Sequence, residues 1–225
     1  MAYSSNIYFY EVGGGFEPDN QEGVGIANIE KYLRSFGFGK GMSNELLGDI
    51  TGTIPNPKWK EENFNGDPWR LGDTYFTSIG QYGLQVTPIQ VARALSAIAN
   101  GGKVIEPRIT KDSPMIISNT IKNIDQDNFE IVKSGMRDAV EFGTAKGLNI
   151  PEVEIAAKTG TAELGVSKAR VNSWITGFFP YQSPKYAFVV VMEQGSRSNL
   201  IGGVAVMRRV LDWMRLNDSP YLNNS

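Results

Sequence analysis

The sequence predicts an α+β fold in which helices pack around a largely antiparallel β-sheet. Two observations indicate this class. The first two thirds of the chain hold helical patterns with start and stop signals, whereas the last third changes to strand patterns before a final helix. The 225 residues are 41% hydrophobic and 20% charged, which is enough to bury one sizeable core. A single globular domain is therefore the expected organisation.

The first helical pattern lies at residues 28–36, where apolar residues recur at spacings of three and four and Gly37 ends the helix. Residues 37–75 are rich in Gly, Pro, Asn and Trp without sustained periodicity. We therefore predict loop there, with at most short helices. A loop of this length is functional or acts as a lid.

The clearest helix begins with Thr87 as its N-cap and Pro88 at its first position, and it stops at residues 101–102, which are both glycine. A further helix is predicted over residues 127–143. Glu130 follows the first residue of that range by three positions, in the pattern of a capping box. Together the two helices cover the middle of the chain.

Three strands are predicted after these helices, at residues 154–161, 173–179 and 186–193. The turn at residues 180–185 joins the last two into a β-hairpin. The run AFVVVM in the last strand is apolar on both faces, which is typical of a central strand covered by helices on each side.

An amphipathic helix of about residues 204–216 closes the chain. Sequence periodicity assigns its packing stripe to Val206, Val210, Trp213 and Met214. The chain shows no internal repeat, so the prediction remains one set of helices around one sheet.

The amino-acid composition excludes several kinds of catalytic and metal site. The chain contains neither Cys nor His, so a Ser-His-Asp triad, a Cys-His dyad and a zinc site built from His are excluded, and a general base has to be Lys, Asp, Glu or Tyr. The net charge of −2 mixes both signs without a basic stripe, which does not favour nucleic acid as a partner. No stretch approaches the roughly 20 apolar residues of a membrane span, and the start lacks the features of a signal peptide.

Residues Lys158, Thr159, Gly160 and Thr161 lie on the first predicted strand and form a candidate peptide-binding site. Glycine lets a ligand approach the strand edge closely, and that edge offers N–H and C=O groups to an added strand. The threonine hydroxyls and the lysine charge suit a terminal carboxylate. Taken alone, however, a Lys-Thr-Gly triplet more often means an edge strand with a solvated lysine.

The sequence Ser4-Ser5-Asn6 supplies the context that this triplet needs. Ser-x-Asn together with Lys-Thr-Gly is two of the three motifs shared by penicillin-binding proteins and class A β-lactamases. Further stretches resemble class B penicillin-binding proteins of the elongation type, and the resemblance covers nearly the whole chain: SSNIYFY, IPNPKWK, WRLGDTYFTSIGQ, VTPIQVARALSAIANGG, AAKTGTAE and SWITGFFP. Several motifs in the right order are far more specific than any one of them.

This resemblance implies the serine β-lactamase and penicillin-binding-protein transpeptidase fold, with its sheet covered by helices on both faces. It further implies that residues 1–225 are part of a transpeptidase domain whose N-terminal portion is missing, and that residues 37–80 form a long loop-rich insertion. No cofactor and no metal belong to this chemistry.

The resemblance also implies roles for the two motif residues near the start. Ser4 is expected to relay protons between the nucleophile and the leaving group, and Asn6 to hydrogen-bond the acyl-side amide of the substrate and a catalytic lysine. A hydroxyl both donates and accepts, as a relay requires, and an amide does the same without titrating. For either residue alone, a helix cap or a turn would be the commoner role.

On the strand, the resemblance implies that Lys158 supports Ser4 electrostatically. Thr159 and Thr161 bind the carboxylate of the donor peptide or of a β-lactam, the Thr161 N–H forms half of the oxyanion hole, and Gly160 keeps the strand edge open. Losing one oxyanion-hole donor typically costs about 3 kcal/mol in the transition state.

The nucleophile of the family comes from a Ser-x-x-Lys motif upstream of Ser-x-Asn, and no serine of this chain has lysine at the third position after it. We therefore expect a chain cut off downstream of the nucleophilic serine, which by itself binds weakly and is not acylated. A second departure is Tyr82, which stands where the family usually has glycine in Gly-Gln-Gly. A turn that needs positive φ there would be strained by tyrosine.

Three functions remain open at this point. The first is a fragment of a peptidoglycan D,D-transpeptidase, whose partners are the D-Ala-D-Ala stem peptide, β-lactam antibiotics and membrane proteins of the elongation machinery. The second is a non-catalytic module that binds stem peptide or a partner, and the third is a β-lactamase or β-lactam sensor. By resemblance, the parent protein lies outside the cytoplasmic membrane, anchored by an N-terminal span that this chain does not contain.

Overall fold

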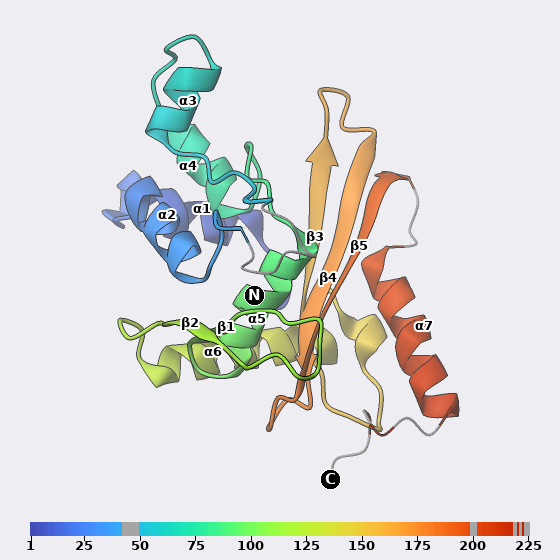
Figure 1. The fold of residues 1–225 in the computed structure, drawn as a ribbon. Coiled ribbons are helices and arrows are strands. Elements are labelled where there is room, and N and C mark those ends of the chain that lie inside the picture. The colour runs from blue at the N-terminus through green and yellow to red at the C-terminus, as the bar shows by residue number, and fades with distance from the viewer. Residues whose placement is uncertain (42–49, 199–201, 218–219, 221, 223–225) are drawn as a thin grey trace. The chain divides into compact units, whose positions relative to one another are not determined.

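The computed structural model describes residues 1–41, 50–198, 202–217, 220 and 222 (Figure 1). The chain divides into two compact units, each of which is described by itself. The first unit consists of residues 1–4, 91–105 and 115–225, and the second of residues 5–90 and 106–114. In the described part of the chain, every helix falls short of the length and apolar character that a membrane crossing requires.

The first unit is built on an antiparallel sheet of three strands in the order β3-β4-β5. Their bounds are Ala156–Leu164 for β3, Arg170–Phe179 for β4 and Tyr186–Ser196 for β5. All three predicted strands are thus present. Each extends three residues further than expected at one end, and β3 starts two residues later than predicted. The prediction of a central position for the AFVVVM run is wrong for the described sheet, in which β4 is the middle strand.

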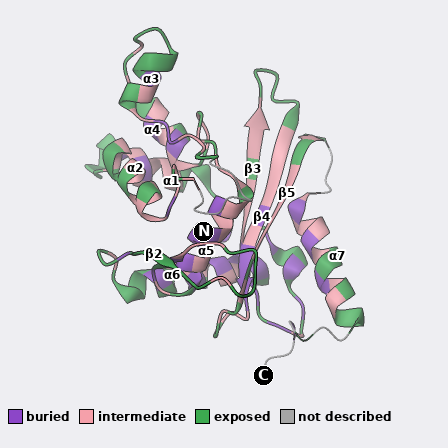
Figure 2. Ribbon diagram, in the orientation of Figure 1, coloured by how far each residue is buried: buried purple, intermediate pink, exposed green. Residues whose placement is uncertain are grey.

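Helices cover both faces of this sheet, as the predicted fold class requires (Figure 1). On one face, α6 (Gln126–Glu141) and the later part of α5 (Pro88–Ala99) bury Leu95 and Met136 against Ala156 of β3 and Phe178 of β4. Figure 2 shows buried residues concentrated where these helices meet the strands. This apolar layer holds the start of β3, at Ala156, in place.

The opposite face of the sheet is covered by α7 (Gly203–Leu216). Met207 and Leu211 of this helix join Ala157 and Ile175 of the sheet in the larger core cluster. The alternation of side chains along β3 and β4 therefore separates two apolar layers, one on each face.

The predicted packing stripe of α7 is wrong for Val210 and Trp213, whereas Met214 packs against the larger core cluster as predicted. The fully buried positions are Gly203, Met207 and Leu211, whereas the side chains of Val210 and Trp213 are 37% and 62% exposed. The sequence VAVMRRVLDWM contains two neighbouring apolar stripes offset by one residue, and periodicity alone does not decide between them.

The ends of α5 and α6 follow the predictions only in part. Thr87 accepts a hydrogen bond from the backbone N–H of Gln90 at 3.3 Å, so it caps α5 as expected. The predicted capping box of α6 is wrong, because the helix starts one residue earlier, after Asp125, without a side-chain cap. Glu130 instead pairs with Lys133 at 2.8 Å.

Three short elements complete the first unit: β1 (Lys103–Ile105), β2 (Ile117–Thr120) and the 3₁₀ helix η2 (Lys146–Leu148).

The second unit is mainly helical. Its elements are α1 (Asn6–Gly14), the 3₁₀ helix η1 (Glu17–Asp19), α2 (Gly25–Ser35), α3 (Pro57–Asn63) and α4 (Leu71–Ser78). The predicted helix at residues 28–36 corresponds to α2. Of the predicted loop, residues 42–49 lie outside the described residues, and the remainder contains α3 and α4, which have seven and eight residues.

Close packing of α1 against α4 depends on two glycines. A Cβ atom at Gly13 would overlap the side chain of Ser78, and one at Gly14 would overlap the ring of Tyr75. The Ser78 hydroxyl uses this proximity to donate a hydrogen bond of 2.9 Å to the carbonyl oxygen of Phe9. Sequence patterns missed α1, since its run of aromatic residues and two glycines has no clear helical stripe.

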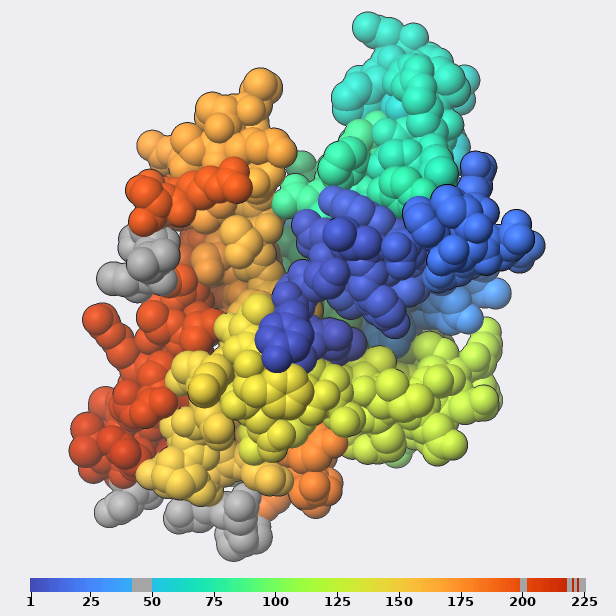
Figure 3. Space-filling view, turned by 180° about the vertical axis from the view of Figure 1, so that it is seen from behind, coloured from blue at the N-terminus to red at the C-terminus, as the bar shows by residue number. Residues whose placement is uncertain are grey.

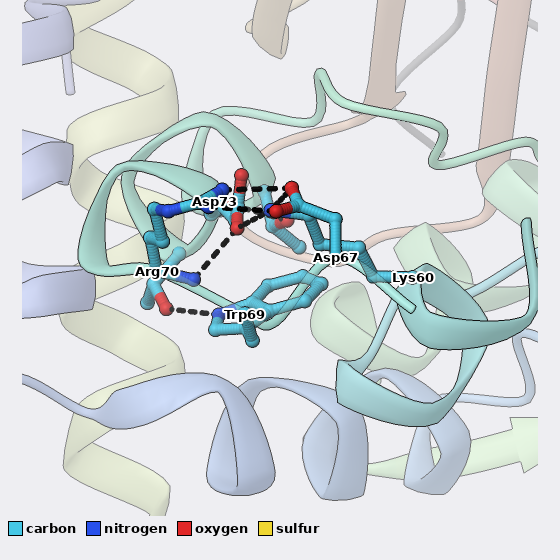
Figure 4. A network of polar contacts seen from close by, with 7 residues as sticks. Lys60, Asp67, Trp69, Arg70 and Asp73 are labelled. Atoms are coloured by element: carbon cyan, nitrogen blue, oxygen red, sulfur yellow. Dashed lines mark hydrogen bonds and ion pairs between the residues drawn. The ribbon is translucent and has the colours of Figure 1, made fainter. Parts of the chain in front are cut away.

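A network of charges around the buried side chain of Lys60 joins α3 to α4 (Figure 4). The Lys60 ammonium, whose side chain is only 4% exposed, lies 2.6 Å from Asp73 and 2.9 Å from Asp67. Asp67 also pairs with Arg70 at 2.6 Å, and the backbone N–H of Arg70 donates to Asp73 at 2.7 Å. Trp69 closes the group with a hydrogen bond of 2.8 Å from its indole N–H to Thr74.

The network keeps its members charged. Burial alone lowers the pKa of Lys60, but hydrogen bonds to Asp73 and Asp67 together hold that pKa above the ordinary lysine value. Hydrogen bonds from Arg70 and Lys60 hold the pKa of Asp67 well below its usual range.

A cluster of aromatic rings surrounds Tyr82, whose φ of +64° is the strained conformation anticipated from the sequence. The rings of Trp59, Phe64 and Trp69 all lie within 6.3 Å of the Tyr82 ring centroid.

We expect Lys60→Met to lower the free energy of unfolding of the chain clearly, because it leaves the largely buried Asp73 without its cation, whereas Asp67 keeps its pair with Arg70. Lys58→Met is the matched control on the same helix. Lys58 is 82% exposed and lies 3.7 Å from Glu62, so its loss should change stability by no more than about 0.5 kcal/mol. Denaturant unfolding of the three proteins measures both effects.

The same comparison has a pH signature. The raised pKa of Lys60 contributes stability below its ordinary value of 10.5, and the lowered pKa of Asp67 contributes stability above its ordinary value of 3.8. The difference in the free energy of unfolding between wild type and Lys60→Met should therefore be constant near neutral pH. It should shrink as the pH falls below 3.8, the ordinary pKa of aspartate. A gap that widens in acid would contradict this account of the network.

Candidate functional site

Lys158, Thr159, Gly160 and Thr161 lie on β3, at one end of the described sheet. The register pairs Lys158 with Thr176 and Gly160 with Trp174 of β4. On its other side β3 has no strand partner among the described residues. The strand is buried up to Ala157 and becomes partly exposed from Lys158 onward. The four motif residues thus begin where the apolar core ends.

The Lys158 ammonium makes two short hydrogen bonds. It donates to the Ser4 hydroxyl at 2.6 Å and to the carbonyl oxygen of Thr159 at 2.7 Å. Partial burial lowers the pKa of Lys158. The structure thus brings together a lysine and a serine that are 154 positions apart in the sequence.

Ser4 is held in an unusual backbone conformation. Its φ is +55°, which is uncommon for a residue other than glycine, and its N–H closes a turn by donating to the carbonyl oxygen of Met1 at 3.1 Å. Strained residues of this kind persist only where their surroundings hold them, and they gather at functional sites. The conformation leaves the Ser4 hydroxyl within reach of Lys158.

The first residues of the chain are anchored to the segment that follows α6. Thr144 donates its backbone N–H to the carbonyl oxygen of Ala2 at 3.1 Å, and a Cβ atom at Gly143 would overlap that same oxygen. The rings of Tyr3 and Phe142 lie 6.0 Å apart. Figure 3 shows the start of the chain, in dark blue, against the yellow surface of α6 and the residues after it.

Asn6 lies in the second unit and is described there alone. It is the first residue of α1, whose N-cap is Ser5. The Ser5 hydroxyl accepts a hydrogen bond of 3.4 Å from the backbone N–H of Tyr8. The structure therefore unites Ser4 with the residues of β3, whereas Asn6 belongs to a helix end.

Thr144 is a further residue at the site, and sequence reasoning missed it. Its hydroxyl lies 2.7 Å from the hydroxyl of Thr159. The sequence offered one signal, a threonine directly after the glycine that ends a helix, but that glycine was used only as a stop for α6. The contact between the two hydroxyls depends on how the segment after α6 reaches the strand, which local sequence does not reveal.

The arrangement suits binding of an anion and transfer of a proton. A hydroxyl that accepts from an ammonium still has its own hydrogen to donate, so Ser4 can pass a proton while Lys158 steadies its oxygen. The strand adds the hydroxyl of Thr159, and Thr161 on the same strand carries a further one. In the described part of the chain, no three His, Cys, Asp or Glu side chains are grouped so as to hold a metal ion.

Comparison with curated proteins finds relatives that are peptidoglycan D,D-transpeptidases. The chain is 29% identical over 241 residues to the peptidoglycan D,D-transpeptidase MrdA of Escherichia coli K12, an alignment that covers 96% of this chain and 36% of MrdA. It is 28% identical over 214 residues to the MrdA of Acinetobacter baumannii, covering 85% of this chain and 30% of that protein. The chain thus spans about a third of the length of these curated relatives.

Solved structures show the same similarity in three dimensions. Penicillin-binding protein PBP2 of Helicobacter pylori superposes with a TM-score of 0.78 at 30% identity, over 98% of this chain and 39% of that one. PBP2 of Pseudomonas aeruginosa, solved in complex with WCK 5153, has a TM-score of 0.76 at 28% identity, over 94% of this chain and 47% of that one. The serine β-lactamase and penicillin-binding-protein type of α+β fold expected from the sequence is therefore confirmed.

A family model decides the assignment. The model of the penicillin binding protein transpeptidase domain matches residues 1–212, which is nearly the whole chain. The chain therefore belongs to the family of penicillin-binding-protein transpeptidase domains.

Proposed function

We propose that this chain serves a peptidoglycan D,D-transpeptidase of the elongation type, which crosslinks stem peptides through a serine acyl-enzyme. The observation that supports this most directly is the 2.6 Å hydrogen bond from Lys158 to Ser4, which joins the first residue of the Ser-x-Asn motif to the Lys-Thr-Gly motif within the first unit. The match to the transpeptidase family points to the same chemistry. The acylated serine would lie outside these 225 residues, since none of their serines has lysine at the third position after it.

In this proposal the donor peptide adds along the open edge of β3. Its terminal carboxylate meets the hydroxyls of Thr159 and Thr161 beside the charge of Lys158. The Thr161 N–H supplies half of the oxyanion hole, and Gly160 leaves room for the peptide backbone.

Proton transfer falls to Ser4 in the proposed reaction. When the D-Ala-D-Ala amide is cleaved, the Ser4 hydroxyl gives its hydrogen to the departing amine and takes one from the attacking serine hydroxyl. Lys158 remains protonated and stabilises the Ser4 oxygen. Asn6 would hydrogen-bond the acyl-side amide of the substrate.

The wider setting forms part of the same proposal. Residues 1–225 would belong to one transpeptidase domain, with residues 37–80 as an insertion, on the extracytoplasmic side of the membrane. Its ligands would be the D-Ala-D-Ala stem peptide and β-lactams. The PBP2 of Helicobacter pylori has been solved in complex with MreC, which supports membrane proteins of the elongation machinery as partners of this chain.

Binding of a stem-peptide analogue tests the proposed site. We expect diacetyl-L-lysyl-D-alanyl-D-alanine to shift the amide NMR signals of β3 in the 225-residue chain, and its C-terminal amide to bind more weakly. Lys158→Ala should weaken binding of the acid roughly tenfold or more, since it removes a charged hydrogen-bond donor. Lys168→Ala is the control, because Lys168 is 59% exposed and pairs with Glu163 at 2.8 Å.

Acylation distinguishes the catalytic proposal from a binding module. In the protein expressed from its complete reading frame, fluorescent penicillin should label a serine, and Ser4→Ala should slow that labelling strongly. Peptide binding without any labelling would favour the non-catalytic module. Equal binding of the acid and the amide would overturn the carboxylate site itself.

The pH dependence of peptide binding follows from burial of Lys158. Its pKa lies below the ordinary value of 10.5, so the ammonium loses its charge at a lower pH than an exposed lysine does. Affinity for the acid should be constant near neutral pH and fall with a midpoint below 10.5. Lys158→Arg should abolish this fall, because arginine stays charged. A midpoint at or above the ordinary value would rule out control by Lys158.

A further inference from the structure

Thr144 holds two parts of the site with two different groups. Its backbone N–H donates to the carbonyl oxygen of Ala2 at 3.1 Å, two residues before Ser4. Its hydroxyl meets the hydroxyl of Thr159 at 2.7 Å. Thr144, in the segment that follows α6, therefore links the residues around Ser4 to the strand that carries Lys158.

The backbone half of this link is independent of the Thr144 side chain. Gly143 and Ala2 approach so closely that no Cβ atom fits at Gly143. Ala145 is fully buried in the larger core cluster, which fixes the chain on the other side of Thr144. The position of the Thr144 hydroxyl is thus set by backbone contacts and by the buried neighbour.

The contact between the Thr144 and Thr159 hydroxyls imposes a direction on the hydrogen bond between them. Each hydroxyl has a single hydrogen, so in a pair one oxygen donates and the other accepts. When Thr159 donates to an anion, it has to accept from Thr144. The Thr159 carbonyl oxygen is already occupied by the Lys158 ammonium at 2.7 Å. Thr159 is therefore held at its backbone by Lys158 and at its side chain by Thr144.

We propose that Thr144 is a positioning residue for carboxylate recognition, which donates to Thr159 and thereby turns the Thr159 hydrogen towards the ligand. This inference rests on the proposed function, because it assigns Thr159 a carboxylate to bind. Thr144 acts through Thr159 and needs no contact with the ligand. Serine can fill the role, whereas valine has the same shape but cannot donate.

The experiment compares wild type, Thr144→Val and Thr144→Ser in the 225-residue chain. Titration with diacetyl-L-lysyl-D-alanyl-D-alanine, followed by NMR, should show affinity reduced roughly fivefold by Thr144→Val, the size expected for one net hydrogen bond. Thr144→Ser should bind as wild type does, and affinity for the C-terminal amide should be the same in all three. Thr120→Val, at an exposed position of β2, controls for loss of a threonine elsewhere.

A second measurement needs no ligand. Scalar couplings across the Thr159 Cα–Cβ bond should report one side-chain rotamer in wild type and Thr144→Ser, and averaging between rotamers in Thr144→Val. Hydrogen exchange of the Thr144 amide should stay unchanged, because its bond to Ala2 does not involve the side chain. Faster exchange there would mean a structural role and would overturn the inference.

The remaining outcomes separate the two proposals. If wild type binds the acid and Thr144→Val binds it equally well, Thr144 does not position Thr159. If wild type fails to prefer the acid over the amide, the proposed function is wrong. In that case a fixed Thr159 rotamer in Thr144→Val would overturn the inference independently.

Discussion

The register of β3 against β4 decides what each side chain of the candidate site can reach. Neighbouring residues of a strand point to opposite faces, so a slip by one position would turn Lys158 and Thr159 each to the opposite face of the sheet. Two apolar layers prevent that slip, because Ala156 packs with Phe178 on one face and Ala157 with Ile175 on the other. The core therefore fixes the site at its border, where β3 emerges from the buried interior.

Local signals in the sequence predicted most of the helices and strands that position the candidate site. Alternation found the three strands of the sheet, and Thr87 with Pro88 found the start of α5. The ordered motifs, and not composition or periodicity, led to Ser4, Lys158 and the threonines of β3. Those signals work because a strand or a capped helix is specified by residues close together in the chain.

The failures have a common physical origin in contacts between distant segments. Helix α7 has two candidate apolar stripes, and only its packing on Ile175 selects the one with Met207. The glycines of α1 look like helix breakers until α4 lies against them, and Thr144 gains a role only when it meets Thr159. Likewise, Tyr82 at positive φ is unfavourable locally and is held by aromatic rings brought from elsewhere in its unit.

The pairing of Thr144 with Thr159 bears on how resistance to antibiotics could arise in such a domain. A substitution at Thr144 changes no motif residue, so it would escape notice in a survey of the motifs. Under the proposed function, a stem peptide and a β-lactam would present the same kind of anionic group to the same hydroxyls. A variant that rejected the drug by this route would then also handicap cell-wall synthesis, so selection would have to restore substrate recognition at a second position.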